Sequence, residues 1–301
     1  MRRTYKLFVE SSHGVHATAT KGFNADIAKV YNAARPTYPT AALDKVNHLL
    51  KIEASAVNHG GTVIELGAGT GKFTKTFLTY GKTAPVVSQY PAFQNMKYVA
   101  TEPSDGFRTI LAQELSQDHS DVQTTTATGS AIPFPEHTVS AVIVAQAFHW
   151  MATTDTLTEV HRVLAPERPL IMLWNAYDYS FDWLRQIDQQ ILSKAYLPGV
   201  PHHQNGLWED CFRTEIGKKL FTPVQKWHCQ YVQHGGEDMV VGRVMSTSVV
   251  EAKSVQEKQE IEKIVRHIIA THPELAQARQ TGKFEISYVT KLAWVNSKYK
   301  L

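Results

Sequence analysis

A short segment near residue 65 combines one acid with closely spaced glycines. Residues 63–66 are apolar except for Glu65, which is typical of a strand buried in a sheet. Three glycines follow on alternate positions: Gly67, Gly69 and Gly71. Because glycine has no Cβ, such a turn can be sharp and can let a ligand lie against the backbone. The helix predicted over residues 72–80 would point its N-terminal amides at the same place, so the pattern indicates a nucleoside site.

The spacing of these glycines decides among three kinds of site. A dinucleotide fingerprint needs Gly-x-Gly-x-x-Gly, and here the third glycine, Gly71, comes one residue early. A phosphate-binding P-loop needs glycine, and serine or threonine, where this chain has Leu66 and Phe73. Neither alternative fits, which leaves a nucleoside turn of another kind or a glycine-rich turn with a purely structural role.

The string Glu-Leu-Gly-Ala-Gly-Thr-Gly, residues 65–71, resembles motif I of the class I S-adenosylmethionine-dependent methyltransferases. The resemblance implies an α/β fold, with a Rossmann-like doubly wound sheet of seven strands whose last strand is antiparallel. It also implies S-adenosyl-L-methionine as the cofactor and S-adenosyl-L-homocysteine as its product. Within the string, the implied cofactor contacts are Glu65, Gly67, Ala68, Gly69 and Gly71.

A second acid, Glu102, ends the strand predicted over residues 97–101. A carboxylate at this place can accept two hydrogen bonds from ribose hydroxyls, as in nucleotide-binding α/β sheets generally. We therefore expect Glu102 to bind the cofactor, together with its neighbours Pro103 and Ser104. A surface excursion over residues 81–96, rich in proline, glutamine and small residues, explains its long separation from the glycine turn. The alternative is an ordinary surface glutamate.

In this methyltransferase class, an Asp-x-Ala-Glu string before Leu-Pro-Phe contacts the adenine. This chain departs from that pattern, because Thr128 and Ser130 occupy the positions of the acids, with Gly129 between them. Hydroxyl groups can still bond the edge of a base, and a backbone amide can supply the main contact. We expect these three residues to contact the adenine.

Two further strings resemble a subgroup of small-molecule methyltransferases that includes trans-aconitate methyltransferase. One begins with Ala145 and Gln146 and continues Ala-Phe-His-Trp, and the other is Tyr31 followed by Arg-Pro-Thr-Tyr-Pro from Arg35. The resemblance implies that Tyr31 stacks near the cofactor and that Arg35 pairs with the cofactor's carboxylate or with an acidic substrate. It also places Ala145 and Gln146 beside the cofactor. The alternative is a core tyrosine and a surface arginine.

Methyl transfer needs a nucleophile aligned with a methyl group that a sulfonium already activates, so proximity supplies most of the rate and a base is optional. His149 is the candidate base or orienting group, because it follows a strand end and titrates near neutrality. Phe148 and Trp150 are expected to form an apolar wall, and Trp174 to line the acceptor pocket. Other side chains could line the same pocket: Trp183, Trp208, His202 and His203. For each of these side chains a structural role is the alternative.

Alternating strands and helices predict a doubly wound sheet that positions these residues. Strands are expected over residues 63–66, 97–101, 122–126, 139–145, 170–174, 224–232 and 284–295. Helices are expected over residues 23–31, 41–52, 72–80, 106–115, 155–164, 183–194, 209–218 and 255–271. The expected organisation is an N-terminal segment that closes over the cofactor (1–40), a cofactor-binding core (41–176), and cap helices with the last two strands (177–301).

Composition narrows the class of protein. The 301 residues contain 31 basic and 28 acidic side chains with no dense basic block, so nucleic acid is not suggested as a partner. The 2 cysteines lie outside any metal-like spacing, which predicts a reduced, intracellular protein without a metal site. No apolar run is long enough to span a bilayer. We expect a cytoplasmic enzyme whose basic N-terminus is a flexible start and not a transit peptide.

These observations predict methyl transfer to an oxygen of a small molecule, a carboxylate or a hydroxyl, by a monomer or homodimer. A carboxylate needs no base at neutral pH, whereas a hydroxyl or an amine does. One alternative is a protein that holds the cofactor to regulate a partner. Another is an enzyme that uses the sulfonium charge for cyclisation or rearrangement. A nicotinamide dehydrogenase is disfavoured by the glycine spacing.

Overall fold

The computed structural model describes residues 34–50, 61–83, 96–116, 118–119, 121–196 and 200–299. The helix expected over residues 23–31 lies outside these ranges, as does Tyr31. Most of the excursion expected over residues 81–96 is also outside them, and its first three residues continue a helix. None of the helices in the described ranges combines the length and the apolarity that crossing a bilayer requires.

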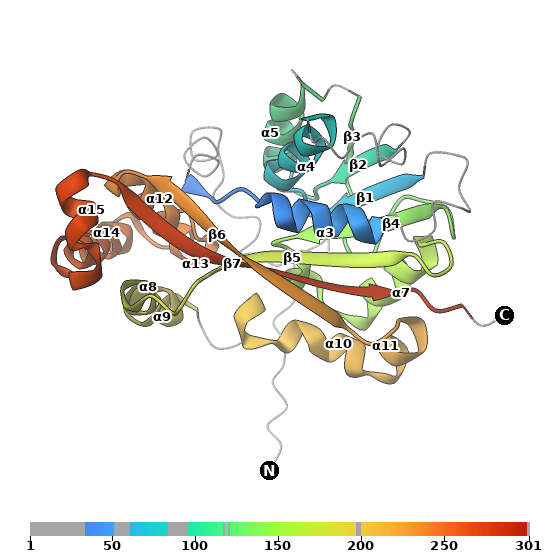
Figure 1. Ribbon diagram of the computed structural model, residues 1–301. Helices are drawn as coiled ribbons and strands as arrows, with labels where there is room; N and C mark the ends of the chain where they lie inside the picture. The colour runs from blue at the N-terminus through green and yellow to red at the C-terminus, as the bar shows by residue number, and fades with distance from the viewer. Residues whose placement is uncertain are drawn as a thin grey trace, which may run out of the picture.

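A mixed sheet of seven strands organises the fold (Figure 1). Its strands are β1 (Thr62–Leu66), β2 (Lys97–Thr101), β3 (Gln123–Thr125), β4 (Val139–Ala145), β5 (Pro169–Tyr177), β6 (Gln225–Gly235) and β7 (Phe284–Asn296). They lie in the order β3-β2-β1-β4-β5-β7-β6. The first five strands are parallel, and β7 runs antiparallel to both β5 and β6. This topology confirms the expected Rossmann-like sheet with an antiparallel last strand.

The central strands are buried on both faces, as their continuous apolar sequences predict. In β4, Val142 and Val144 belong to one core layer, and Ala141, Ile143 and Ala145 belong to the other. Successive side chains of a strand point to opposite faces, so a single apolar strand supplies both layers. Helices therefore have to cover both sides of the sheet.

The first half of the chain supplies a helix layer on each face. Its described helices are α3 (Thr40–Leu50), α4 (Lys72–Thr83), α5 (Asp105–Leu115), α6 (Phe148–Met151) and α7 (Thr154–Val163). One face is covered by α3, α4 and α5 through residues such as Val46, Phe77 and Leu111. The other is covered by α6 and α7 through Phe148 and Val160. The turns that lead into α4 and α6 thereby come to the same edge of the sheet.

The second half of the chain adds helices around an extension of the sheet (Figure 1). They are α8 (Asp182–Ile187), α9 (Ser193–Ala195), α10 (Asp210–Arg213), α11 (Glu215–Leu220), α12 (Glu237–Met245), α13 (Ser248–Glu251), α14 (Val255–Thr271) and α15 (Ala276–Thr281). The paired ends of β6 and β7 reach beyond β5. A third core lies there, between Tyr288 of β7, Trp183 of α8, Val244 of α12 and Val265 of α14.

Three stretches of this half differ from the expected helices. The helix expected over residues 209–218 is divided at Thr214, whose side-chain oxygen accepts the Gly217 N–H and starts α11 as a new helix. The helix expected over residues 183–194 contains a π-helical turn at Asp188–Leu192, a feature frequent near functional sites. The sequence pattern predicted no element where α12 and α13 lie.

Candidate active site

A cavity of about 260 Å³ opens at the carboxyl ends of β1, β2, β4 and β5. Open α/β sheets bind their ligands at this edge, where the turns after parallel strands converge. The expected site residues that line the cavity are Arg35, Glu65, Gly67, Ala68, Gly69, Glu102, Pro103, Thr128, Gly129, Ala145, Gln146, His149 and Trp150. Those that are described but do not line it are Gly71, Ser104, Ser130, Phe148 and Trp174.

The glycines after β1 have different tasks although all three have positive φ angles. A Cβ at Gly67 would lie 2.9 Å from that of Ala147, and a Cβ at Gly71 would lie 2.6 Å from Leu111 Cδ1. These two glycines allow the turn to pack against its neighbours. Gly69, with φ of 59°, lines the cavity, and no atom of the described residues lies within 4 Å of its Cβ position. It is the position at which a ligand can approach the backbone.

Glu65 is a buried acid near the end of β1. Its Oε2 accepts hydrogen bonds from the hydroxyls of Thr74 (2.6 Å) and Tyr98 (2.8 Å). Its Oε1 is buried and has no hydrogen-bond partner among the described residues, and Glu65 lines the cavity. Burial raises the pKa of this carboxyl to about 7, while the two hydroxyls oppose the rise and Glu102 adds to it. A cation beside Oε1 would interact favourably with that oxygen and would lower the pKa of the Glu65 carboxyl.

Glu102 follows β2 and is also buried. Its Oε2 accepts the Gly69 N–H at 2.9 Å, and its Oε1 accepts the Ser104 N–H at 3.0 Å. Burial raises the pKa of Glu102, and these two amide bonds and Arg108 oppose the rise. Each carboxylate oxygen keeps a further lone pair for a hydroxyl group in the cavity. Ser104 therefore supports Glu102 through its backbone and does not reach the cavity itself.

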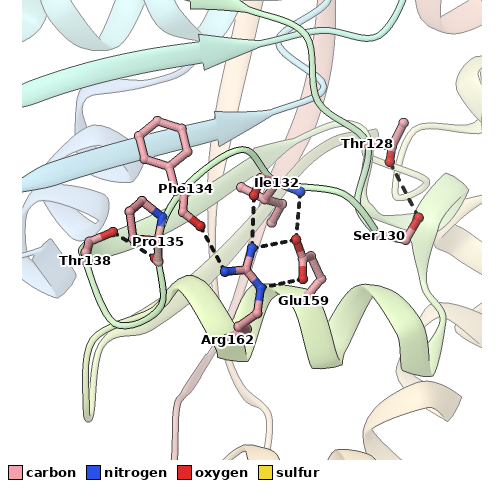
Figure 2. A network of polar contacts seen from close by, with 8 residues as sticks. All are labelled: Thr128, Ser130, Ile132, Phe134, Pro135, Thr138, Glu159 and Arg162. Carbon is pink, nitrogen blue, oxygen red and sulfur yellow. Dashed lines mark hydrogen bonds and ion pairs between the residues drawn. The ribbon is translucent and has the colours of Figure 1, made fainter.

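An ion pair on α7 fixes the loop after β3 (Figure 2). Glu159 Oε1 accepts the Ile132 N–H at 2.9 Å, and Arg162 binds both carboxylate oxygens of Glu159 at 2.8 Å. Arg162 also donates to the carbonyl oxygens of Ile132 (3.0 Å) and Phe134 (2.9 Å). One guanidinium thus fixes two carbonyls and one carboxylate, which holds the loop against the sheet.

Thr128 and Gly129 lie at the cavity on this loop, whereas Ser130 is exposed beside it. Gly129 lies so close to α7 that a Cβ there would be 2.6 Å from Thr156 Oγ1. The Ser130 hydroxyl lies 3.5 Å from that of Thr128 (Figure 2). Of the three expected adenine contacts, the structure brings two to the cavity.

Gln146 begins the turn after β4 in a left-handed backbone conformation, with φ of 62°. Its N–H donates to the Leu173 carbonyl at 2.8 Å, which ties this turn to β5. A residue other than glycine is strained in this conformation, and such positions concentrate at functional sites. Ala145 and Ala147 on either side have small side chains, which leave the cavity open beside the glycine turn.

His149 is the second residue of α6, and its side chain lines the cavity. The indole Nε1 of Trp174, on β5, donates a hydrogen bond to His149 Nδ1 at 3.2 Å. Burial lowers the pKa of His149 well below its usual range, and the nearby His203, His202 and Arg35 lower it further. The imidazole is therefore neutral at physiological pH.

Phe148 does not form the expected wall of the pocket. Its side chain is fully buried and stacks on Phe212 at 5.6 Å between ring centroids, with Trp208 edge-on at 6.2 Å. The cause is the start of α6, which turns residue 148 into the core layer of α7 and residue 149 toward the cavity. Trp174 is likewise 2% exposed and lies behind His149.

Arg243 brings a cation to the far side of the cavity from α12. It is 7% exposed, its guanidinium lies 5.0 Å from the ring centroid of Tyr177, and it donates to Thr247 Oγ1 at 3.2 Å. Neither Arg243 nor its helix was predicted from the sequence. The signal that could have identified them is one arginine within the apolar helical face formed by the valines of α12.

His203 also lines the far side, with its ring stacked on Trp174 at 6.0 Å and 15°. Within the part of the chain that the structure describes, its buried Nε2 has no hydrogen-bond partner, and burial lowers the pKa of the imidazole to about 3. Its neighbours in the same half of the cavity include Tyr196 and Gln204, which sequence reasoning also missed. The other side chains considered for this pocket do not line it: Trp183, His202 and Trp208.

Comparisons with known proteins agree with this geometry. The sequence profile of a methyltransferase domain matches residues 64–172, which run from β1 into β5. An uncharacterized methyltransferase of Schizosaccharomyces pombe is 27% identical over 273 residues, 89% of this chain and 94% of its own. An uncharacterized methyltransferase of Mycobacterium tuberculosis strain H37Rv is 28% identical and covers 86% of this chain and 89% of its own.

Solved structures share the fold at low sequence identity. A type II methyltransferase from Anaeromyxobacter dehalogenans superimposes with a TM-score of 0.54 at 16% identity, covering 88% of this chain and 97% of its own. A methyltransferase from an antibiotic biosynthesis pathway of Anabaena variabilis gives 0.51 at 14% identity, covering 87% and 98%. The Rossmann-like sheet is thus common to this chain and to these two proteins.

The groups around the glycine turn fit the cofactor of that class of enzymes. Glu65 Oε1 is a buried acceptor to which no described residue donates, so it can accept a hydrogen bond from the ammonium group. Glu102 retains lone pairs for the hydroxyls of a ribose, and the space beside Gly69 admits a nucleoside. The matched domain, the relatives and the sheet topology lead to one assignment. The chain is a class I methyltransferase, and its cofactor is S-adenosyl-L-methionine.

Proposed function

We propose that this enzyme methylates an oxygen atom of a small anionic molecule, which binds between Arg243 and His149. The observation that carries the proposal is the distribution of charge around the cavity. Among the described residues that line it, the only carboxylates are Glu65 and Glu102, and both belong to the strand-end half. Lys72, at the start of α4 beside the glycine turn, lines the same half as these carboxylates. The other half holds Arg243, with Arg35 between the two and no carboxylate among the described lining residues. Such an arrangement attracts an anion and repels a cation.

We assign the strand-end half to the cofactor. Glu102 would accept the ribose hydroxyls, Thr128 and Gly129 would contact the adenine, and Glu65 would pair with the ammonium group. Arg35 donates through Nη2 to the Ser246 carbonyl at 2.5 Å and is assigned to the cofactor's carboxylate. Residues 177–301 would then form the cap over the acceptor.

Bound S-adenosylmethionine supplies a methyl group that the sulfonium charge already activates. The protein has to hold an oxygen in line with that group and to exclude water, and alignment of this kind can be worth an effective concentration of ~10⁵ M or more. Arg243 would hold the anion, and its own position is fixed by Tyr177 and Thr247. Trp150 lines the cavity and would supply an apolar contact.

A methyl-transfer screen tests the proposal. The purified enzyme is incubated with a metabolite extract and cofactor labelled in the methyl group, and mass spectrometry identifies what gains the label. We expect an acid to be labelled, and Arg243→Met to raise its KM by about 10- to 100-fold, as for a lost charged hydrogen bond. Affinity for S-adenosylhomocysteine, measured by calorimetry, should be unchanged.

Two matched variants make this test specific. Arg243→Lys keeps the charge and should retain more of the affinity for the acceptor than Arg243→Met. Gly69→Arg fills the open space beside the turn and should abolish both cofactor binding and labelling. A neutral or cationic acceptor, with the same KM in wild type and Arg243→Met, contradicts the proposal.

A further inference from the structure

The hydrogen bond between Trp174 and His149 fixes which nitrogen of the imidazole carries the proton. An indole Nε1–H can only donate, so the nitrogen that faces it at 3.2 Å has to accept. That nitrogen is Nδ1, so a neutral His149 carries its hydrogen on Nε2. Trp174 cannot turn away easily, because it is 2% exposed and packs against the rings of His203 and Trp208.

The surroundings of His149 also keep the ring neutral. The charged or titratable groups that act on it are His203 and His202 from the segment before α10, and Arg35 from the N-terminal side. All three oppose a positive charge on the imidazole. The carboxylates that line the cavity, Glu65 and Glu102, lie in its strand-end half. A proton added to Nδ1 would also have to displace the indole hydrogen bond.

These contacts remove one of the two roles that the sequence allows for His149. A general base needs a free lone pair within reach of the acceptor's proton. In His149 the only lone pair faces Trp174, and the nitrogen left for the cavity carries a hydrogen. His149 can therefore donate a hydrogen bond to an acceptor but cannot remove its proton.

We infer that His149 is a hydrogen-bond donor that positions a carboxylate oxygen of the acceptor, and that the product is a methyl ester. The inference rests on the proposed function. The other histidine that lines the cavity, His203, is a weak base because burial lowers its pKa to about 3. The acceptor is thereby narrowed to the oxygen type that needs no base, because a carboxylate is already ionised at neutral pH. A carboxylate oxygen forms the new bond to the methyl carbon, the bond from that carbon to sulfur breaks, and its electron pair stays on sulfur. No proton is transferred.

The tautomer is tested first, on the full-length protein. Long-range ¹H–¹⁵N spectra of the labelled protein distinguish a protonated from an unprotonated ring nitrogen, and comparison with His149→Gln identifies the His149 signals. We expect hydrogen on Nε2 and a bare Nδ1 from pH 6 to pH 8. Trp174→Phe should allow both tautomers, whereas Trp208→Phe, at a neighbouring buried tryptophan, should not. A hydrogen on Nδ1 in the wild type overturns the inference.

The second test uses matched probes, benzoate and decanoate against benzyl alcohol and decanol, together with any acceptor found in the extract screen. Mild alkali releases labelled methanol from a methyl ester and from no methyl ether, amine or carbon product. We expect only acids to give alkali-labile label, with kcat/KM independent of pH between 6 and 8 at saturating cofactor. His149→Gln keeps an N–H donor and should retain activity, whereas His149→Phe should raise the KM for the acid about tenfold.

The outcomes separate the inference from the proposed function. Alkali-stable label on a hydroxyl compound, with a rate that rises with pH and loses that rise in His149→Gln, leaves oxygen methylation standing and overturns the donor role. Label on an amine, on carbon or on a protein overturns the proposed function as well. An Nε2–H tautomer combined with an alkali-labile product supports both.

Discussion

Binding of the cofactor should release a proton from Glu65 at mildly acidic pH. In the apo protein this carboxyl is buried, none of the residues that the structure describes donates to its Oε1, and burial raises its pKa to about 7. An ammonium group placed beside Oε1 favours the ionised form, so the pKa has to fall when the cofactor binds. The proton that Glu65 carries in the apo protein then leaves with binding.

The size of the effect follows from the pKa. A fall from about 7 to the ordinary value of 4.5 is worth roughly 3 kcal/mol between the two protonation states. By linkage, binding at pH 6 should release about 0.9 proton, and at pH 7.5 only about 0.2. Affinity at pH 6 should accordingly be about eightfold weaker than at pH 7.5.

The raised pKa of Glu65 also makes the stability of the apo protein depend on pH. The dependence is opposite to that of the usual acid, whose pKa is lowered by folding. Because the folded-state pKa of Glu65 is raised, folding favours its protonated form. The contribution is fully present below about pH 4.5 and is lost as the pH rises to about 7, a loss of roughly 3 kcal/mol relative to an unshifted carboxyl. Cofactor binding should offset this loss, so ligand-induced stabilisation should be larger at pH 7.5 than at pH 6.

Calorimetry in two buffers of different ionisation enthalpy counts the released protons. S-adenosylhomocysteine is compared with 5′-methylthioadenosine, which keeps the ribose and adenine but lacks the amino-acid part. Any proton linked to Glu102 should appear with both ligands, so the difference between them belongs to Glu65. The Glu65→Gln variant should bind S-adenosylhomocysteine without this extra proton. Equal release with both ligands, or unchanged release in Glu65→Gln, refutes the pairing of Glu65 with the ammonium group.

Further substitutions separate binding from packing. In Gly71→Ala the new Cβ would lie 2.6 Å from Leu111 Cδ1, so the free energy of unfolding, measured in urea, should fall by about 2 to 4 kcal/mol. Gly69→Ala should lose only about 1 kcal/mol, yet its affinity for S-adenosylhomocysteine should fall strongly in calorimetry. Phe148→Ala should cost about 3 to 5 kcal/mol because it empties a core site, whereas Trp150→Ala should mainly raise the KM of the acceptor. Arg162→Ala should lose about 2 kcal/mol and weaken cofactor binding several-fold, and thermal melts with and without ligand measure both. If the melting temperature of Phe148→Ala equals that of the wild type, the side chain belongs to the acceptor pocket and not to the core.

The strand-end half of the cavity could be predicted because its residues lie in short segments of the sequence. The strands at residues 97–101 and 139–145 were predicted to the residue, since their apolar runs end at acids or small residues. Glu102 directly follows β2 and Gly69 lies in the turn after β1, so predicting these strands also predicts the cavity residues. Ser104 and Ser130 show the limit of this reasoning. The position of a residue in a motif predicts the loop on which it lies. The backbone conformation of that loop determines which of its side chains point toward the ligand.

The far half of the cavity could not be predicted in this way, because packing between distant elements creates it. Arg243 reaches the cavity only because β6 and β7 extend past β5 and carry α12 over it. Phe148 and His149 differ by one position, yet the start of α6 sends one into the core and the other to the cavity. Aromatic character alone did not distinguish them.

The role of His149 depends on the same kind of long-range contact. Its sequence position and its ordinary pKa allow either a base or a hydrogen-bond donor. The deciding partner, Trp174, lies 25 residues away on the neighbouring strand, and its indole occupies the one lone pair that a base would use. An acceptor that already carries its negative charge is the one that such a site can methylate without moving a proton. Under the proposed function, the contact between β5 and α6 selects an acceptor of this kind. A relative with the same glycine turn but without that tryptophan would be free to use its histidine as a base.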